Sequence, residues 1–91
     1  MTTLKGIITD IFPAEVYGNF EKRAFWVQQT EEKYPEHWEL ELQQGDCPML
    51  DKFKVGDRVE CFVQIRGRKW SKNGKDGIRN TLKCTEINRI L

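Results

Sequence analysis

Hydrophobic and polar residues alternate along several segments of the chain, with the period of two that is typical of half-buried β-strands. The clearest case is HWELELQ, residues 37–43, in which every second side chain between Trp38 and Leu42 is apolar. The same analysis predicts further strands over residues 4–12, 20–30, 59–66 and 78–90.

The segments between these strands contain the residues that favour turns and helix ends. Proline follows the first strand, a turn-like stretch covers residues 14–19, and residues 31–36 form a connector. Residues 45–53 have helical spacing of apolar side chains and predict one or two helical turns, with Asp46 as the capping residue. Residues 67–77 contain three glycines and predict a loop.

The order of elements is strand, strand, strand, short helix, strand, strand. Five strands with one helix between the third and the fourth is the order of the oligonucleotide-binding (OB) fold, a Greek-key barrel whose closure removes exposed edges. A chain of 91 residues has room for one modest core. We therefore predict an all-β fold with small helical content, a single five-stranded OB domain over residues 1–91.

The phase of each strand assigns its aromatic side chains to the core or to the surface. Phe25 and Val27 share the core face of the second strand, so Trp26 is expected on the outer face, in line with Lys22. The alternative for Trp26 is that it packs beneath a loop or against a partner subunit. Trp38 has the phase of the apolar residues in its strand and is assigned mainly to the core.

The charges are unevenly distributed, although the formal net charge is only +1. Residues 1–50 contain four Lys or Arg and nine Asp or Glu, which gives −5, whereas residues 51–91 contain eleven and five, which gives +6. Seven of the basic residues fall within residues 66–83, beside a single acid, Asp76. One concentrated basic segment in a nearly neutral protein indicates a local anionic partner.

The segment 66–79 combines cations with an aromatic ring. Cations neutralise phosphates and aromatic rings stack on bases, at about 1–3 kcal/mol for each stacked base. An exposed tryptophan in a mobile, polar loop has little structural purpose unless it folds back onto the barrel. The alternative is a solvated hairpin whose lysines keep an edge from aggregating. The residues assigned here to nucleic-acid binding are Arg66, Arg68, Lys69, Trp70, Lys72, Lys75 and Arg79.

Residues outside this loop extend the candidate site. In an OB barrel, the loop between strands four and five flanks the ligand groove, to which strand two also contributes. Lys22 and Trp26 lie on that part of strand two, and Lys83 extends the basic strip along strand five. Tyr17 and Phe20 are placed to stack at the opposite rim, or else to anchor their loop in the core.

Two acids and one aromatic residue qualify this picture. Glu39 and Glu41 face outward on strand three and repel phosphate there, unless they pair with lysines. We therefore expect a bound strand to follow the loop side of the barrel. Phe62 is out of phase with the apolar face of its strand and is equally suited to an oligomer contact or to a base platform.

The chain also resembles a known family. Residues 45–63, which contain the turn KVGDRV at 54–59, look like the helix and the entry to strand four of single-stranded DNA-binding OB domains. More broadly, the chain resembles a small OB-like family of unknown function found in Bacteroidetes and their phages. The matching features are the segment LKGII at 4–8, the segment FWVQQTEEKYP at 25–35 and the Val-Gly-Asp turn. The resemblance implies the OB fold and the binding of single-stranded DNA.

Little in the sequence favours catalysis or a bound cofactor. The chain has no glycine-rich phosphate loop and no nucleophile–base pair at a recognisable spacing, and His37 is expected to be solvated. None of its three cysteines forms a CxxC pair, so we expect no metal site and no disulfide, but buried free thiols in a reducing compartment. We find neither a signal peptide nor an apolar run near the ~20 residues of a membrane helix, and we expect a cytoplasmic protein.

The sequence therefore predicts a non-catalytic protein, cellular or phage-encoded, that binds single-stranded DNA in replication, recombination or repair. A homo-oligomer is also expected, with Phe62 or the edge of the first strand as its contact, because one OB fold covers only ~4–16 nucleotides and tight, cooperative binding needs more than one barrel. Two alternatives are an OB-like module for protein interaction or assembly, and an RNA-binding OB protein.

Overall fold

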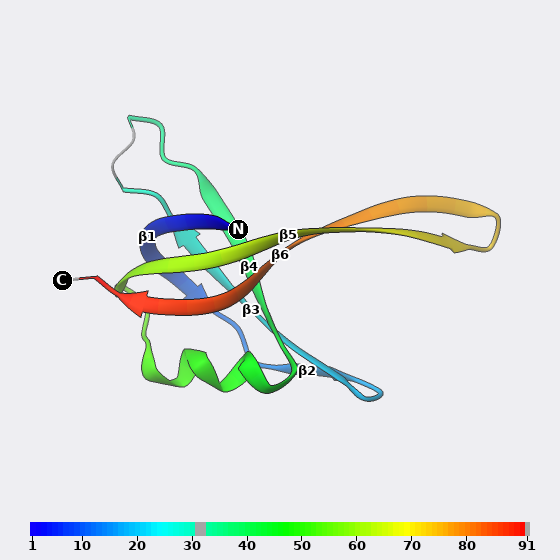
Figure 1. The fold of residues 1–91 in the computed structure, drawn as a ribbon, viewed down its shortest axis with the longest axis horizontal. Helices are drawn as coiled ribbons and strands as arrows, with labels where there is room; N and C mark the ends of the chain where they lie inside the picture. The colour runs from blue at the N-terminus through cyan, green and yellow to red at the C-terminus, as the bar shows by residue number, and fades with distance from the viewer. Residues whose placement is uncertain (31–32, 91) are drawn as a thin grey trace.

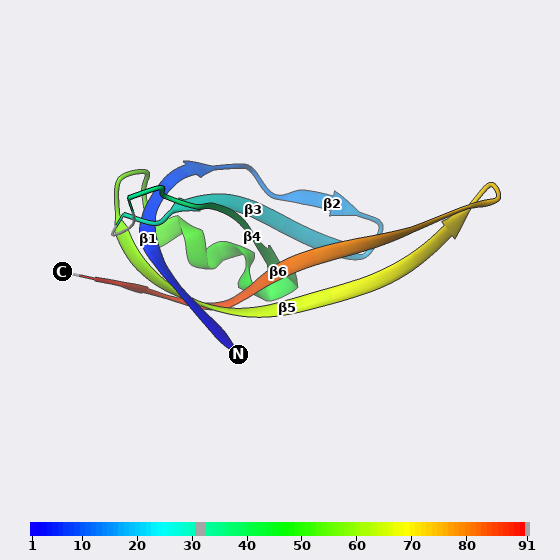
Figure 2. The ribbon, with the colours of Figure 1, turned by 90° about the horizontal axis from the view of Figure 1, so that it is seen from above.

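The computed structural model describes residues 1–30 and 33–90, and its strands wrap into a closed barrel from which one pair of strands projects (Figures 1 and 2). A 3-10 helix, η1 (Gln44–Lys52), lies between the fourth strand and the fifth. The strands are β1 (Thr2–Ile11), β2 (Glu15–Tyr17), β3 (Phe20–Gln28), β4 (His37–Gln43), β5 (Arg58–Lys72) and β6 (Lys75–Arg89).

The barrel closes because β1 changes its partner along its length. The sheet order is β1-β5-β6-β4-β3-β2, and β1 also pairs with β3. The first part of β1, Thr2–Ile7, pairs with β5, and the second part, Ile7–Ile11, pairs with β3. The short strand β2 adds to β3 at the margin of the sheet. The five long strands, with the helix between β4 and β5, confirm the predicted OB barrel.

Gly6 allows β1 to cross closely over β3. A Cβ atom at this position would overlap the backbone carbonyl of Gln28, well inside van der Waals contact. Since that carbonyl belongs to the backbone of a paired strand, it cannot move aside as a side chain can. Glycine at this position is therefore required for the barrel to close.

The core consists of the side chains that alternation had assigned to the inner faces. Phe25 and Val27 are fully buried, whereas Trp26 between them is 41% exposed, as predicted. Trp38 is partly buried and packs against the margin of this core. The helix contributes Cys47 and Leu50, and the core residues are Leu4, Ile8, Phe25, Val27, Leu40, Leu42, Cys47, Leu50, Val59, Cys61, Val63, Cys84 and Ile87.

The three cysteines are free and buried, as the sequence predicted. Burial raises the pKa of the Cys47 thiol to about 11. The hydrogen bond with Cys84, together with burial, raises the pKa of Cys61 as well. These two thiols therefore stay protonated at neutral pH, and packing explains their presence better than reactivity does.

The Val-Gly-Asp turn ties the beginning of β5 to β1 and to β6. Gly56 has a φ of +99° and donates its backbone N–H to the Ile8 carbonyl oxygen at 2.8 Å. The Asp57 carboxylate accepts the Lys54 backbone N–H at 2.9 Å and an Arg89 Nη2–H at 3.1 Å. These two interactions lower the pKa of Asp57. The turn therefore has a structural function, which accounts for this part of the family resemblance.

The predicted loop over residues 67–77 is wrong. β5 continues to Lys72 and β6 begins at Lys75, so a turn of two residues, Asn73 and Gly74, is all that separates them. Both turn residues have positive φ, +53° and +77°, which is the backbone that Asn-Gly favours in tight hairpins. The glycines at the two ends of this segment were interpreted as loop residues, although both lie within strands.

Smaller differences concern the ends of elements. The turn-like stretch over residues 14–19 contains β2, and the helix begins one residue before the predicted segment and ends one residue before its end. Asp46 does not cap it, because the helix begins earlier, after Gln43, and has no side-chain cap hydrogen bond. The predicted connector over 31–36 lies partly outside the described residues. No helix within residues 1–30 and 33–90 has the length and apolar character needed to span a membrane.

Candidate nucleic-acid interface

The outer parts of β5 and β6 form a two-stranded extension of the barrel, called the ribbon below. It comprises residues 66–72 of β5 and 75–81 of β6, paired in antiparallel register from Arg66↔Thr81 to Lys72↔Lys75. The pairing of β5 with β1 ends at Val63, and the bridge from β6 to β4 is at Lys83. The ribbon therefore extends beyond the sheet, as Figure 1 shows.

The two faces of the ribbon differ in chemistry. Arg66, Arg68 and Trp70 share one face of β5, and the register places Arg79 and Thr81 of β6 on the same face. Alternation directs Ile65, Lys69 and Ile78 to the opposite face, where the two isoleucines are 68% and 74% exposed. The ribbon thus presents a cationic, aromatic face on one side and, on the other, a mixed face that includes Lys69 and the exposed Ile78.

Trp70 is held on the ribbon by the glycine opposite to it. Trp70 pairs with Gly77 across the two strands, and its indole covers the position that a Cβ of Gly77 would occupy. The side chain remains 46% exposed. Trp70 therefore belongs to an ordered strand pair instead of the predicted mobile loop, and it presents an open ring surface with part of its side-chain entropy already lost.

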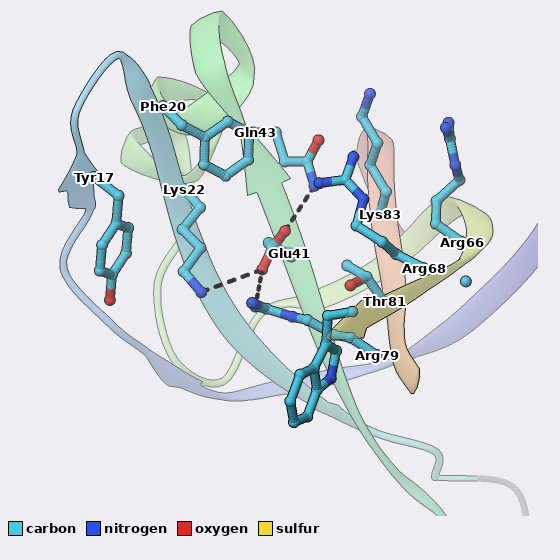
Figure 3. Close-up of a pocket in the computed structure, with 12 residues that line it drawn as sticks. Tyr17, Phe20, Lys22, Glu41, Gln43, Arg66, Arg68, Arg79, Thr81 and Lys83 are labelled. Carbon is cyan, nitrogen blue, oxygen red and sulfur yellow. Dashed lines mark hydrogen bonds and ion pairs between the residues drawn. The ribbon is translucent and has the colours of Figure 1, made fainter. Parts of the chain in front are cut away.

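A groove of about 760 Å³ lies between the ribbon and the hairpin of β2 and β3. Figure 3 shows Tyr17 and Phe20 on one side and Arg66 and Arg68 on the other. The groove is lined by side chains from five strands that lie far apart in the sequence. They are Tyr17, Phe20, Lys22, Glu41, Gln43, Arg66, Gly67, Arg68, Trp70, Arg79, Thr81 and Lys83.

The groove brings together most of the residues that sequence analysis had assigned to nucleic-acid binding, and four of those candidates lie outside it. Lys72 and Lys75 form the last pair before the turn at the ribbon tip, and Lys69 lies on the opposite face. Trp26 lines a second, adjoining groove of about 340 Å³. The members brought together are Tyr17, Phe20, Lys22, Arg66, Arg68, Trp70, Arg79 and Lys83.

Trp26 is fixed in the second groove by two contacts. Its Nε1–H donates to Glu39 Oε2 at 2.8 Å, and its ring meets the Phe12 ring edge-on, with centroids 4.9 Å apart and an interplanar angle of 63°. Lys22, Glu41 and Arg79 line this groove as well as the larger one, so the two form a continuous path.

Glu41 lies at the junction of the two grooves and is paired with cations, the arrangement that the sequence left open. Its Oε1 is 3.9 Å from Lys22 Nζ and 3.6 Å from Arg79 Nη2. Its Oε2 accepts a hydrogen bond from Gln43 Nε2 at 2.7 Å (Figure 3). The side chain is 14% exposed. Sequence analysis had treated this acid as an obstacle to phosphate and had not identified Gln43 or Thr81.

Tyr17 forms part of the rim opposite the ribbon. Its hydroxyl donates to Glu15 Oε2 at 2.7 Å, and this hydrogen bond raises the pKa of Tyr17. Lys22 Nζ lies 5.2 Å from the centroid of the Tyr17 ring, in the geometry of a cation–π interaction. Because the side chain is 58% exposed, its ring remains accessible at the entrance of the groove.

Ligands for a metal ion are not grouped within residues 1–30 and 33–90, where no cluster of three or more His, Cys, Asp or Glu side chains has a suitable arrangement. The chemistry of the groove is therefore that of its cations, its aromatic rings and the Glu41 carboxylate. Such a surface can neutralise phosphates and stack bases.

Comparison with solved structures identifies chains with the same fold, among them two single-stranded DNA-binding proteins. A mitochondrial single-stranded DNA-binding protein from S. cerevisiae is 13% identical, with a TM-score of 0.76, and the alignment covers 98% of this chain and 92% of that one. A Plasmodium falciparum SSB, solved in complex with ssDNA, is 14% identical, with a TM-score of 0.64 and the same coverage. Both similarities establish the OB fold of single-stranded DNA-binding proteins for this chain.

The search of curated proteins gave no match. A family model matches residues 3–88, which include every strand except the two residues at the ends of β1 and β6. The chain therefore belongs to the family described as the domain of unknown function DUF3127.

Proposed function

We propose that this protein is a non-catalytic binder of single-stranded DNA that acts in DNA replication, recombination or repair. The observation that carries the proposal is the convergence of Arg66, Arg68, Arg79 and Lys22 with exposed Trp70 in one groove. The fold agrees with it, since a chain of the same fold was solved with ssDNA.

Phosphate neutralisation and base stacking involve different residues in this mechanism. Arg66 and Arg68 on the ribbon and Lys83 at its base neutralise phosphates, which releases counterions and makes the affinity depend on salt. Bases stack on Trp70, with Tyr17 and Phe20 at the opposite rim, and each stack contributes about 1–3 kcal/mol.

The bound strand follows the path that the two grooves define. It runs past Trp70 in the larger groove and over the junction at Lys22 to Trp26 in the second groove, and Lys72 and Lys75 at the ribbon tip lie beyond the larger groove. The rest of the outer sheet contributes little, because its cations do not line either groove.

A titration of fluorescent oligo-dT at about 50 mM and about 200 mM salt tests this proposal, since phosphate contacts weaken as salt rises. Two neighbouring charge reversals provide a matched pair, because Arg68 faces the groove and Lys69 faces away from it. We expect R68E to weaken binding at least about tenfold and K69E by about threefold or less, in line with loss of a direct phosphate contact in the first variant alone. We expect Trp70→Ala to weaken binding by about tenfold, the cost of one stacked base.

The absence of binding to both oligo-dT and oligo-rU at low salt would show that the proposed function is wrong. Equal losses for R68E and K69E would retain the function but move the site away from the groove. Tighter binding of oligo-rU than of oligo-dT would favour the RNA-binding alternative, in which the 2′-hydroxyl is recognised.

We also propose that the protein self-associates. We further propose that it acts in the reducing environment of the cytoplasm, either of a cell or of a phage-infected host. Phe62 and the edge of β1 were the contacts expected from the sequence. Ile65, at the base of the ribbon, and Ile78, on the face opposite the groove, are also exposed and available for such a contact. Sedimentation velocity of the wild type and of I65S/I78S tests this: a wild type that is monomeric at all concentrations contradicts it.

A further inference from the structure

Glu41 lies at the junction that a strand passing between the two grooves crosses. It lines both grooves together with Lys22 and Arg79, and these three side chains come from β4, β3 and β6. A strand that reaches from Trp70 to Trp26 therefore passes directly over this cluster. An acid in that place needs an explanation if the groove binds phosphates.

The contacts of the carboxylate resemble those that a phosphate would make. One oxygen, Oε1, faces both Lys22 Nζ and Arg79 Nη2, at 3.9 Å and 3.6 Å. The other, Oε2, accepts from the Gln43 amide at 2.7 Å. One oxygen thus faces two cations and the other holds a hydrogen bond, so the carboxylate occupies the place between the cations that a phosphate would take.

Glu41 and Lys22 form a more buried ion pair than ordinary surface pairs do. Their side chains are 14% and 21% exposed, whereas Arg79, which approaches Glu41 from the ribbon, is 59% exposed. Charges in such a partly buried site are less screened by salt than exposed ones. An entering phosphate must therefore compete with an established partner for both cations.

We infer that Glu41 determines the affinity of the groove, because its carboxylate holds Lys22 and Arg79 in the free protein and yields them to a phosphate in the complex. This inference rests on the proposed function and adds the residue that limits it. Binding at the junction is an exchange of one anion for another, so these two cations contribute less to affinity than Arg66 and Arg68 do. A carboxylate fixed in the groove also weakens the binding of any anion that cannot displace it.

The test compares Glu41→Gln with the wild type in oligo-dT titrations at two salt concentrations. Glutamine keeps the size of the side chain and can still accept from Gln43, but it has no charge for the two cations. We expect E41Q to bind about threefold to tenfold more tightly at low salt, with a salt slope steeper by about 0.7–1.4, because one or two more cations become available to phosphate.

Glu60→Gln is the matched control. Glu60 also forms an ion pair with a lysine, Lys5, at 3.5 Å, and it does not line either groove. The substitution removes the same charge from the protein, and we expect binding within about twofold of the wild type, the effect of net charge alone. Equal gains in E41Q and E60Q would overturn the inference.

Substitution of Arg79 provides a second test, which distinguishes the proposed role of Glu41 from a purely structural one. In the wild type, Arg79→Gln should cost less affinity than Arg68→Gln, since Arg79 is already neutralised. In the E41Q background, Arg79→Gln should weaken oligo-dT binding at least about threefold more than it does in the wild type. The double-mutant cycle formed by these variants isolates the coupling of the two side chains. The comparison in the wild type remains valid if E41Q does not fold.

The outcomes separate the inference from the function. If the wild type binds oligo-dT and E41Q binds equally or more weakly, Glu41 holds the cations in place for the ligand, and the inference is wrong while the function stands. If neither protein binds oligo-dT, both fail. Binding of oligo-dT by E41Q alone would support the role of the Glu41 carboxylate in limiting affinity, but it would contradict the proposed function of the wild type.

Discussion

The same two strands build the barrel and the ribbon, but they are stabilised in different ways in the two regions. Within the barrel, β5 buries Val59, Cys61 and Val63 against the core. From Ile65 to Lys72 the same strand has no buried residue. The strand pairing continues through both regions, with a register shift between Phe62 and Val63. Strand pairing by itself therefore does not create a core. The core forms where β5 and β6 pack against the other strands of the barrel, and it ends beyond the pairing of β1 with β5 and of β4 with β6.

The ribbon depends on local interactions that the barrel does not need. An isolated two-stranded hairpin is marginally stable in water. Here the Asn73-Gly74 turn, the cover of Gly77 by Trp70 and a hydrogen bond from the Ser71 hydroxyl to Asp76 hold the two strands together. The ribbon is anchored at one end by the barrel, whereas no core residue lies in the ribbon. We therefore expect the barrel to fold without the ribbon.

The largest effect is expected where the barrel closes. Gly6→Ala places a methyl group against the backbone carbonyl of Gln28, so one of the two strands must shift. We expect the free energy of unfolding to fall by about 3 kcal/mol or more, at the upper end for an overpacked site, because backbone is displaced instead of a side chain. Urea denaturation measures this change.

Gly45→Ala is the control for that experiment. Gly45 lies in η1, no atom lies within 4 Å of the position that a Cβ atom would take there, and its φ is outside the left-handed region. The same substitution should therefore change stability by about 0.5 kcal/mol or less. A comparable loss in both variants would mean that the close approach of β1 and β3 does not limit barrel stability.

Removal of the ribbon is expected to change stability less than Gly6→Ala does, but to weaken the binding of oligo-dT strongly. Excision of residues 66–71 and 76–81 removes paired segments of equal length and keeps the Asn-Gly turn, so inner and outer faces retain their phase. We expect cooperative unfolding within about 1 kcal/mol of the wild type, since no core residue is lost. Binding of oligo-dT should fall at least about tenfold, because the cations and the stacking ring are absent.

Two outcomes of that experiment would contradict the comparison. Loss of cooperative unfolding would show that the ribbon stabilises the barrel. Unchanged affinity for oligo-dT in a folded protein would show that the barrel surface binds the strand without it.

The sequence predicted the barrel well because burial imposes a period on each strand. Alternation placed Phe25 and Val27 inside and Trp26 outside, and the strand order placed Lys22 near the 66–79 segment. Both faces of the ribbon are exposed, so no core imposes an alternation of hydrophobic and polar residues on it. Its glycines were therefore interpreted as loop residues. The Asn73-Gly74 turn was the feature that could have identified the hairpin.

The pairing of Glu41 could not be predicted in the same way. Its partners come from β3 and β6, and they depend on how far each strand is shifted relative to its neighbours. Strand order states which elements are adjacent, but the contacts of one carboxylate require the register and the side-chain rotamers. The groove was thus predicted as a set of residues, and its central ion pairs were not.

The smallest effect is expected from Gly77→Ala in the ribbon, and it tests whether ring placement matters for binding. A Cβ at Gly77 would overlap the Trp70 indole, not backbone as at Gly6, so the ring can rotate away. The φ of Gly77 is outside the left-handed region, and alanine can adopt this backbone. We expect a change in stability of about 0.5 kcal/mol or less and an affinity for oligo-dT that is about threefold weaker, a fraction of one stacking interaction.

A double-mutant cycle isolates the cause of that change. In the Trp70→Ala background no ring is present to displace, so Gly77→Ala should have no further effect on oligo-dT affinity. Equal losses in the two backgrounds would show that glycine serves the approach of the ligand itself, not the placement of Trp70. The two glycines then compare directly: at Gly6 the added methyl group meets backbone and destabilises the barrel, and at Gly77 it meets a side chain and weakens binding while the fold remains intact.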